Sequence, residues 1–245
     1  MNKTSMLYWY PLTKSLNIPQ PKTEVAIRKE IKEWFPILDK GLSKTDKDIL
    51  FLKASMIGYP LFMRTNYSSA KHDFKNTCYV PDRESLLQHI FNLFETNYCR
   101  NLYPEALILR EYIELDWKFK AFLDLPIAPE RRYFISDGEV VCHHPYWPED
   151  AIKFYTHNIS ESYPAKLYWH ESLAEMNIES PEEIKLLKDY ATKIGSVLEG
   201  EFSVDFAKGR NGKWYFIDAA SAIQSWHPEE TEHSSFDAPE QSKSG

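Results

Sequence analysis

The segment that decides the predicted fold is EFSVDFAKGRNGKWYFIDAAS, residues 201–221. Its first third alternates apolar and polar residues, which is the period of a half-buried β-strand. Asn211-Gly212, the strongest short hairpin signal, then precedes a second run of aromatic and β-branched residues. If Asn211 and Gly212 form a two-residue loop, Asp205 on the first strand lies opposite Asp218 on the second. The segment therefore predicts a hairpin that carries two opposed carboxylates.

Two opposed carboxylates indicate a site for a divalent cation. Directly opposed side chains in a sheet have Cβ atoms ~4.5–5.5 Å apart, and like charges there destabilise the strand pair. Mg²⁺ would reverse this repulsion between Asp205 and Asp218, because it is usually held by one or two carboxylates plus substrate phosphates. The two-residue loop also predicts that Arg210 faces Lys213. The alternative is a longer loop, residues 209–212, which would shift the register and separate the carboxylates.

The composition is that of an ordinary globular protein. The chain has 245 residues, enough for one or two domains, with 43% hydrophobic and 27% charged residues. Its net charge of −7 argues against a general nucleic-acid binder. No apolar run approaches the ~18 residues of a membrane span, and no secretory signal is recognisable. Three widely spaced cysteines, Cys78, Cys99 and Cys142, favour a reducing compartment, so a cytoplasmic location is expected.

Three helices are predicted from apolar residues at helical spacing. The clearest runs from Pro181 to Leu198, with Ser180 as its N-cap, Glu183 completing a capping box and Gly200 as its stop. Another follows residue 82, and a third spans about residues 45–57. The predicted buried stripes of the three helices, in the order given, are Ile184, Leu187, Ala191, Ile194 and Leu198; Leu86, Leu87, Ile90, Phe91 and Phe94; and Ile49, Leu52 and Met56.

Strands alternate with these helices. The best single strands are residues 59–65 and 106–113, and residues 131–142 read as a hairpin around an Asp-Gly turn. The aromatic segment 145–177 is predicted to be loop plus irregular helix, and the polar tail from residue 228 to be disordered. This mixture predicts an α+β fold with antiparallel sheets.

A polar loop after the strand 59–65 is a candidate phosphate site. The strand ends at Arg64 after wholly apolar residues, so the base of Arg64 is expected to be covered and to require an anion. That anion is either a phosphate or a distant carboxylate such as Glu111 or Glu130. Lys71 and Lys75 follow in the loop, and phosphate loops use such charges with backbone N–H groups. The loop lacks glycine, so a solvated basic turn is the alternative.

The stretch LILREYIEL, residues 107–115, has the pattern of a nucleotide hinge. Adenine is commonly held by backbone groups after an apolar strand, here residues 111–113, and a carboxylate such as Glu114 takes the ribose hydroxyls. The alternative is an ordinary strand end with solvent-facing glutamates. Further along, alternation puts Arg131 and Arg132 on opposite faces of one strand. One of these two arginines must face inward if the strand is covered, and it then needs an anion.

These four pieces, in this order, resemble the ATP-grasp superfamily of carboxylate–amine ligases over residues 16–227. The closest clade is the one named for one arginine and two lysines, represented here by Arg64, Lys71 and Lys75. The motifs that carry the resemblance are NIPQPKT (17–23), IGYPLFMR (57–64), REYI (110–113), SVDF (203–206) and FID (216–218).

The resemblance implies an α+β ATP-grasp fold, with two subdomains whose antiparallel sheets enclose the nucleotide. Residues 16–108 would form the N-terminal subdomain and residues 109–227 the C-terminal subdomain with the metal-binding hairpin. Residues 1–15 would be a remnant of the family's N-terminal region, and residues 228–245 the disordered tail. The oligomeric state is left open.

The implied activity is ATP-dependent, Mg²⁺-dependent ligation of a carboxylate to an amine through an acyl phosphate. The substrates would be small molecules or peptides. The expected roles are catalysis by Arg64, Lys71 and Arg132; nucleotide binding by Arg64, Lys71, Lys75, Glu111, Tyr112, Ile113 and Glu114; and metal binding by Asp205 and Asp218.

The sequence departs from the family at the second metal strand. The usual Glu-x-Asn ending is Asp218-Ala219-Ala220 here, which lacks the asparagine ligand unless Ser221 or Gln224 substitutes. This departure and the short N-terminal region keep a second hypothesis open, a non-catalytic nucleotide-binding or protein-interaction module. A third hypothesis, a carbohydrate- or peptide-binding protein, follows from the high aromatic content of 14 Phe, 15 Tyr and 7 Trp.

Overall fold

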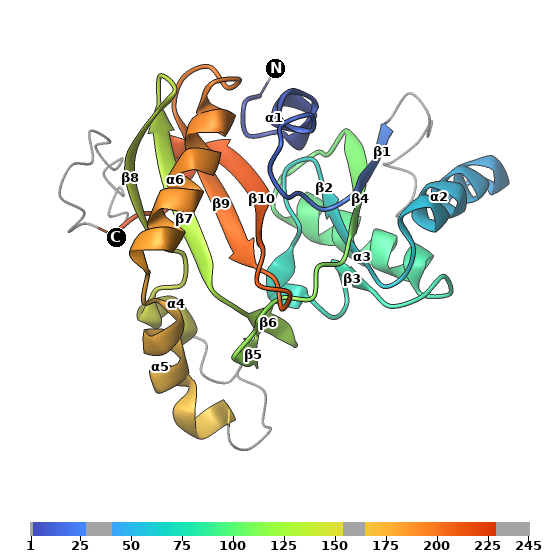
Figure 1. Ribbon diagram of the computed structural model, residues 1–245. Coiled ribbons are helices and arrows are strands. Elements are labelled where there is room, and N and C mark those ends of the chain that lie inside the picture. The colour runs from blue at the N-terminus through green and yellow to red at the C-terminus, as the bar shows by residue number, and fades with distance from the viewer. Residues whose placement is uncertain (1, 28–40, 154–164, 229–245) are drawn as a thin grey trace, which may run out of the picture.

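The computed structural model describes residues 2–27, 41–153 and 165–228 (Figure 1). Their strands form two four-stranded antiparallel sheets and one two-stranded sheet. The first sheet has the order β1-β4-β2-β3, and the second has the order β10-β9-β7-β8. The predicted α+β fold with antiparallel sheets is therefore confirmed.

The strand bounds follow the predicted strands closely. The first sheet holds β1 (Thr23–Ile27), β2 (Leu61–Thr65), β3 (Tyr79–Val80) and β4 (Ala106–Glu111). The second holds β7 (Glu130–Ser136), β8 (Glu139–Pro145), β9 (Phe202–Lys208) and β10 (Trp214–Ser221). The small sheet pairs β5 (Phe119–Ala121) with β6 (Leu125–Ile127). The predicted hairpin around the Asp-Gly turn is the pair β7 and β8.

Helices cover the outer faces of both large sheets (Figure 1). Helices α2 (Lys44–Ile57) and α3 (Leu86–Cys99) share an apolar core with the first sheet, and α6 (Pro181–Gly195) covers the second. Helix α1 (Met6–Thr13) lies where the two sheets meet, and its Trp9 is fully buried against Phe216 of β10. The same cluster includes Ile108 of β4, so one core joins the two sheets.

Helix α6 begins as predicted and ends earlier. The Ser180 hydroxyl accepts a hydrogen bond from the Glu183 N–H, which confirms the N-cap. The Glu183 carboxylate accepts from Arg131 at 2.8 Å, so it is engaged across the core. The helix ends at Gly195, where a Cβ atom would lie 2.8 Å from the carbonyl oxygen of Gly138 in the β7–β8 turn. This close approach of helix to turn requires a residue without a side chain.

The predicted buried stripe of α2 is wrong, whereas that of α3 is confirmed. Leu52 and Met56 of α2 are 63% and 48% exposed, and the helix instead buries Asp46, Leu50 and Ala54. Asp46 accepts a hydrogen bond from the Ser43 hydroxyl at 2.6 Å, which satisfies it at the buried end of this face. On α3, Leu86, Ile90 and Phe94 are fully buried, and Leu87 and Phe91 pack beside them.

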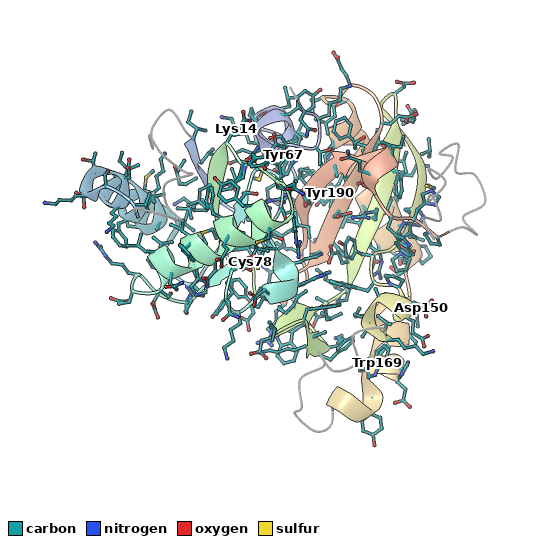
Figure 2. All side chains as sticks on the ribbon, turned by 180° about the vertical axis from the view of Figure 1, so that it is seen from behind. Lys14, Tyr67, Cys78, Asp150, Trp169 and Tyr190 are labelled. Carbon is teal, nitrogen blue, oxygen red and sulfur yellow. The ribbon has the colours of Figure 1, made fainter. Side chains whose placement is uncertain are left out.

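The aromatic segment 145–177 is more helical than predicted. It contains α4 (Glu149–Lys153) and α5 (Ala165–Met176), and residues 154–164 between them lie outside the described residues. Figure 2 shows Trp169 of α5 near the lower end of the molecule. Trp169 is buried with Trp147 and Phe119 of β5 in an apolar cluster. Burial of these large rings explains why an apparently irregular segment forms regular structure.

Two predictions about chain organisation are left as predictions. The proposed boundary between residues 108 and 109 falls inside β4, and nothing tests the subdomain division itself. The predicted disordered tail lies, apart from residue 228, outside the described residues. None of the helices in the described ranges is long and apolar enough to cross a membrane.

Candidate functional site

The hairpin of β9 and β10 carries the predicted carboxylate pair. Asp205 lies directly opposite Asp218, as predicted. The two-residue loop behind that prediction is wrong, because Trp214 pairs with Lys208 and the Gly209 N–H donates to the Lys213 carbonyl. The longer loop was expected to separate the carboxylates, yet they still face each other.

A β-bulge reconciles the longer loop with the opposed carboxylates. The register shifts between Phe216 and Asp218, so Ile217 is the extra residue of β10. Such an extra residue restores the pairing that the longer loop displaced by one position. The bulge also turns the Ile217 carbonyl away from the strand pair, where it accepts a hydrogen bond from Arg110 of β4. The bulged residue therefore connects the two large sheets.

Strand β9 separates the apolar core from a polar cavity. Its residues Phe202, Val204 and Phe206 pack in the core, whereas Asp205 and Ala207 line the cavity. Both faces are buried, so the strand is not half-buried as its alternation predicted. The polar face is covered because the first sheet lies across it.

The cavity has a volume of about 200 Å³ and receives side chains from both large sheets. Its wall includes backbone and side-chain atoms of the predicted hinge residues Glu111, Tyr112 and Ile113. The charged residues that line it, apart from Glu111, are Arg64, Lys71, Arg110, Glu130, Arg132, Asp205 and Asp218.

Arginines neutralise both carboxylates of the predicted metal pair. Arg132 donates two hydrogen bonds to Asp205, from Nε to Oδ1 and from Nη2 to Oδ2, each 2.8 Å long. Arg64 Nη1 lies 2.7 Å from Oδ1 of Asp218. The predicted covered position of Arg64 is confirmed, since it is 5% exposed. Its partner is neither Glu111 nor Glu130, the two carboxylates considered from the sequence.

Lys71 is held beside a buried carboxyl group. Its Nζ donates to the Tyr146 hydroxyl at 3.0 Å and lies 3.9 Å from Oε1 of Glu130. It also lies over the rings of Tyr146 and Trp147, at 4.2 and 4.8 Å from their centroids. This ammonium group is therefore fixed by aromatic faces as well as by charge.

The proton affinities of this pair are shifted by burial. Burial raises the pKa of Glu130 to about 7, although Lys71 opposes the rise. Burial lowers the pKa of Lys71, but Glu130 and Tyr146 outweigh it, so this pKa lies above its ordinary value. Glu130 Oε1 has no hydrogen-bond partner. A buried carboxyl group that exchanges its proton near neutral pH therefore opens into the cavity.

Two predicted nucleotide-binding residues lie outside this cavity. Glu114 and Lys75 line a neighbouring cavity of about 490 Å³, which shares Phe74 and Tyr112 with the first one. Glu114 forms an ion pair with Arg210 and is exposed. Lys75 lies 3.9 Å from Asp124 and is also exposed. The structure thus brings together Arg64, Lys71 and the carboxylates, but not these two residues.

The missing asparagine of the second metal strand is replaced by a residue without a ligand atom. Ala220 lines the cavity at the position two residues after Asp218. Ser221 and Gln224 do not line it, and the Gln224 side chain accepts a hydrogen bond from Thr4. Two carboxylates on one wall suit a single Mg²⁺ whose other ligands are phosphates or water. Within the described ranges, no three His, Cys, Asp or Glu side chains form a metal-binding cluster.

Sequence reasoning missed two charged residues of the cavity, Arg110 and the role of Glu130. Arg110 has the same strand parity as Ile108, which is buried, so alternation alone indicates an inward-facing charge. Glu130 precedes the two arginines of β7 and shares the face of Arg132. Both signals were present, but their partners lie far away in the sequence.

The two sheets with a charged cavity between them define an ATP-grasp domain, and the comparisons with known proteins agree. The model that matches, over residues 55–238, describes an ATP-grasp domain and is family 3 of the clade named for one arginine and two lysines. The chain therefore belongs to that family, and membership implies nucleotide binding. No curated protein sequence matches the chain significantly.

Solved structures support the fold at low sequence identity. C-terminally truncated Cdc123 from Schizosaccharomyces pombe is similar with a TM-score of 0.55 and 13% identity, over 90% of this chain and 86% of Cdc123. The VanG D-Ala:D-Ser ligase from Enterococcus faecalis gives a TM-score of 0.50 and 17% identity, over 89% of this chain and 52% of the ligase. The chain thus spans about half the length of that ligase. At these identities the likeness concerns the fold alone.

Proposed function

We propose that the protein is an ATP-dependent ligase that joins a carboxylate to an amine and releases ADP and phosphate. The observation that carries this proposal is the cavity between the two sheets, where cations and two opposed carboxylates face one another beside the hinge strand. Phosphoryl transfer needs little covalent chemistry from a protein and depends on positioning and charge neutralisation. The charged residues of this cavity provide both.

The proposed reaction has two steps. An oxygen of the substrate carboxylate attacks the γ-phosphorus of ATP, the bond to the β–γ bridging oxygen breaks, and ADP leaves. The amine then attacks the acyl carbon, inorganic phosphate leaves, and the nitrogen loses a proton. Arg64 and Lys71 hold the phosphates, and Arg132 stabilises the transferred phosphoryl group. Glu130, whose pKa is raised to about 7 by burial, is close enough to Lys71 to modulate its charge.

Asp205 and Asp218 are the residues that would hold Mg²⁺. When bound, this cation neutralises the phosphate oxygens during transfer. The present ion pairs do not oppose this role, because arginine is an equally good partner for phosphate and for carboxylate. Arg132 and Arg64 can therefore exchange their carboxylates for phosphates, which frees both aspartates as ligands.

Hydroxylamine offers a test that does not require the amine substrate. It intercepts an acyl phosphate as a hydroxamate, so pools of amino acids, other small carboxylic acids and peptides can be screened with ATP and Mg²⁺. The expected result is a hydroxamate and an equal amount of ADP from at least one pool, and neither product from Arg132→Gln. ATP binding without either product from any pool would contradict ligase activity.

The second candidate is a non-catalytic nucleotide-binding or protein-interaction module. Two observations favour it: Ala220 provides no metal ligand, and both aspartates already have arginine partners. In that case ATP would bind with the same affinity in Mg²⁺ and in EDTA. The ligase proposal requires tighter binding with Mg²⁺. The cytoplasmic location and the small-molecule or peptide substrates are kept as predictions.

A further inference from the structure

Arg110 is a buried cation that none of the predicted roles uses. It lies near the end of β4, the central strand that pairs with both β1 and β2. Its partners across the strands are Thr23 and Phe62, so its side chain extends from the sheet into the region facing β10. Arg110 is 3% exposed and lines the cavity.

Charge pairing in the cavity leaves Arg110 over. Three buried or half-buried carboxylates line the cavity with four cations, and each carboxylate forms an ion pair with one of the other three cations. These pairs are Arg64 with Asp218, Lys71 with Glu130 and Arg132 with Asp205. Within the described ranges, no salt bridge joins Arg110 to a carboxylate.

The unpaired edge of Arg110 has a defined geometry. Nη1 donates to the Ile217 carbonyl, whereas Nε and Nη2 are buried and have no hydrogen-bond partner. Nε and Nη2 form the same edge of the guanidinium group that Arg132 uses to hold both oxygens of Asp205. This edge binds two oxygens of one carboxylate or phosphate in parallel. Arg110 therefore presents an intact bidentate donor that no described residue uses.

An unpaired buried charge is costly to maintain. Transfer of a charge into a poorly solvated site is unfavourable unless a counter-charge or hydrogen bonds compensate for it. Burial and the neighbouring Arg64 lower the pKa of Arg110 to about 10, so the group is still protonated at neutral pH. Asp218 acts in the opposite direction, but it is already bonded to Arg64.

We propose that the Nε and Nη2 edge of Arg110 binds a phosphate group of the nucleotide. The inference rests on the proposed function and adds to it a binding residue that the sequence motifs did not indicate. A phosphate is favoured over a substrate carboxylate because Arg64 and Arg110 lie close enough to affect each other's charge. Two adjacent guanidinium groups attract a multiply charged anion more strongly than a single carboxylate.

The test compares Arg110→Gln with the wild type by calorimetry, using ATP, inorganic tripolyphosphate and adenosine as separate probes. ATP and tripolyphosphate should each bind about 10- to 100-fold more weakly to the variant, the loss typical of a charged hydrogen bond. Adenosine affinity should not change. Arg110→Lys should recover only part of the loss, because a single ammonium group cannot replace the two-donor edge.

The stability of the ligand-free variant separates binding from a structural role. Arg110→Gln removes an unpaired buried charge at similar volume, so its melting temperature should equal or exceed that of the wild type. Arg131→Gln is the matched control, since Arg131 is a buried arginine with carboxylate partners outside the cavity. The control should melt earlier and keep its affinity for ATP.

Each other outcome has a definite meaning. Unchanged affinity of Arg110→Gln for ATP and tripolyphosphate would overturn the inference while leaving the proposed ligase intact. An equal loss for adenosine, or a fall in melting temperature as large as in the control with no selective loss of phosphate ligands, would assign Arg110 a structural role. Failure of the wild type to bind either ATP or tripolyphosphate would refute the nucleotide site, and the inference with it.

Discussion

The two faces of β7 put neighbouring arginines to different uses. Arg131 faces the helices, where its Nε lies 2.8 Å from Glu183 and 3.3 Å from Glu179. Its other nitrogens donate to backbone carbonyls, including those of Met176 and Ile178. Arg132 faces the cavity, where its main partner is Asp205. Similar burial therefore does not imply a similar role.

The difference lies in the partners. Backbone carbonyls and two carboxylates surround Arg131, and Trp214 lies at 5.4 Å from it, so nothing remains for a ligand to replace. Arg132 is held by a single carboxylate that itself opens into the cavity. A set of partners fixed by packing indicates a structural arginine, whereas an exchangeable carboxylate indicates a binding arginine.

The largest effect is expected on the helix-facing side of β7. Arg131→Ala should lower the free energy of unfolding by about 3–5 kcal/mol, because it leaves buried carboxylates without their counter-charge. Denaturant unfolding measures this loss, and calorimetry should show unchanged ATP affinity in the folded protein. Arg132→Ala should cost less stability but weaken ATP binding. Equal destabilisation with equal loss of binding would remove the distinction between the two faces.

Arg64 extends the comparison to the first sheet. Arg64→Ala should reduce ATP affinity by about 1.5–3 kcal/mol, the range for a charge-assisted hydrogen bond. Arg64→Lys should recover only part of it. The alternative is that the contact with Asp218 is only structural. In that case the ligand-free alanine variant would melt earlier while its ATP affinity stayed at the wild-type value.

Glu130 should make the stability of the cavity side depend on pH. Its folded pKa of about 7 lies above the ordinary value of 4.5, so the folded protein binds a proton more tightly than the unfolded chain. This contribution is fully present below about pH 4.5 and is lost as the pH rises through 7. Between pH 5 and pH 8 the wild type should lose about 1–3 kcal/mol more than Glu130→Gln. Parallel stability curves for the two proteins would refute this assignment.

The smallest effect is expected for the carboxylate pair. Asp205→Asn and Asp218→Asn should each weaken Mg²⁺-dependent ATP binding about tenfold, roughly the worth of one charged ligand bond. Binding in EDTA should change less, and both variants should fold. Calorimetry with and without Mg²⁺ gives the comparison. Wild-type affinity in both variants under both conditions would remove these residues from the site.

Local sequence patterns determined most of the secondary structure and the motif order. Alternation and turn residues predicted the hairpin of β9 and β10, and the apolar spacing of α3 predicted its buried face. The N-cap of α6 was readable because capping depends on residues three positions apart. The opposed carboxylates were also predicted, although the loop that was expected to produce them does not form.

Tertiary structure decided which groups meet in the cavity. The bulge at Ile217, the pairing of Arg64 with Asp218 and the unpaired edge of Arg110 depend on how one sheet lies across the other. The exposed stripe of α2 has the same origin, because only packing selects which helix face meets the sheet. Periodicity reports the neighbours of a residue along the chain. Ion pairs between distant strands follow from the shape and charge of the packed interface, which no local pattern encodes.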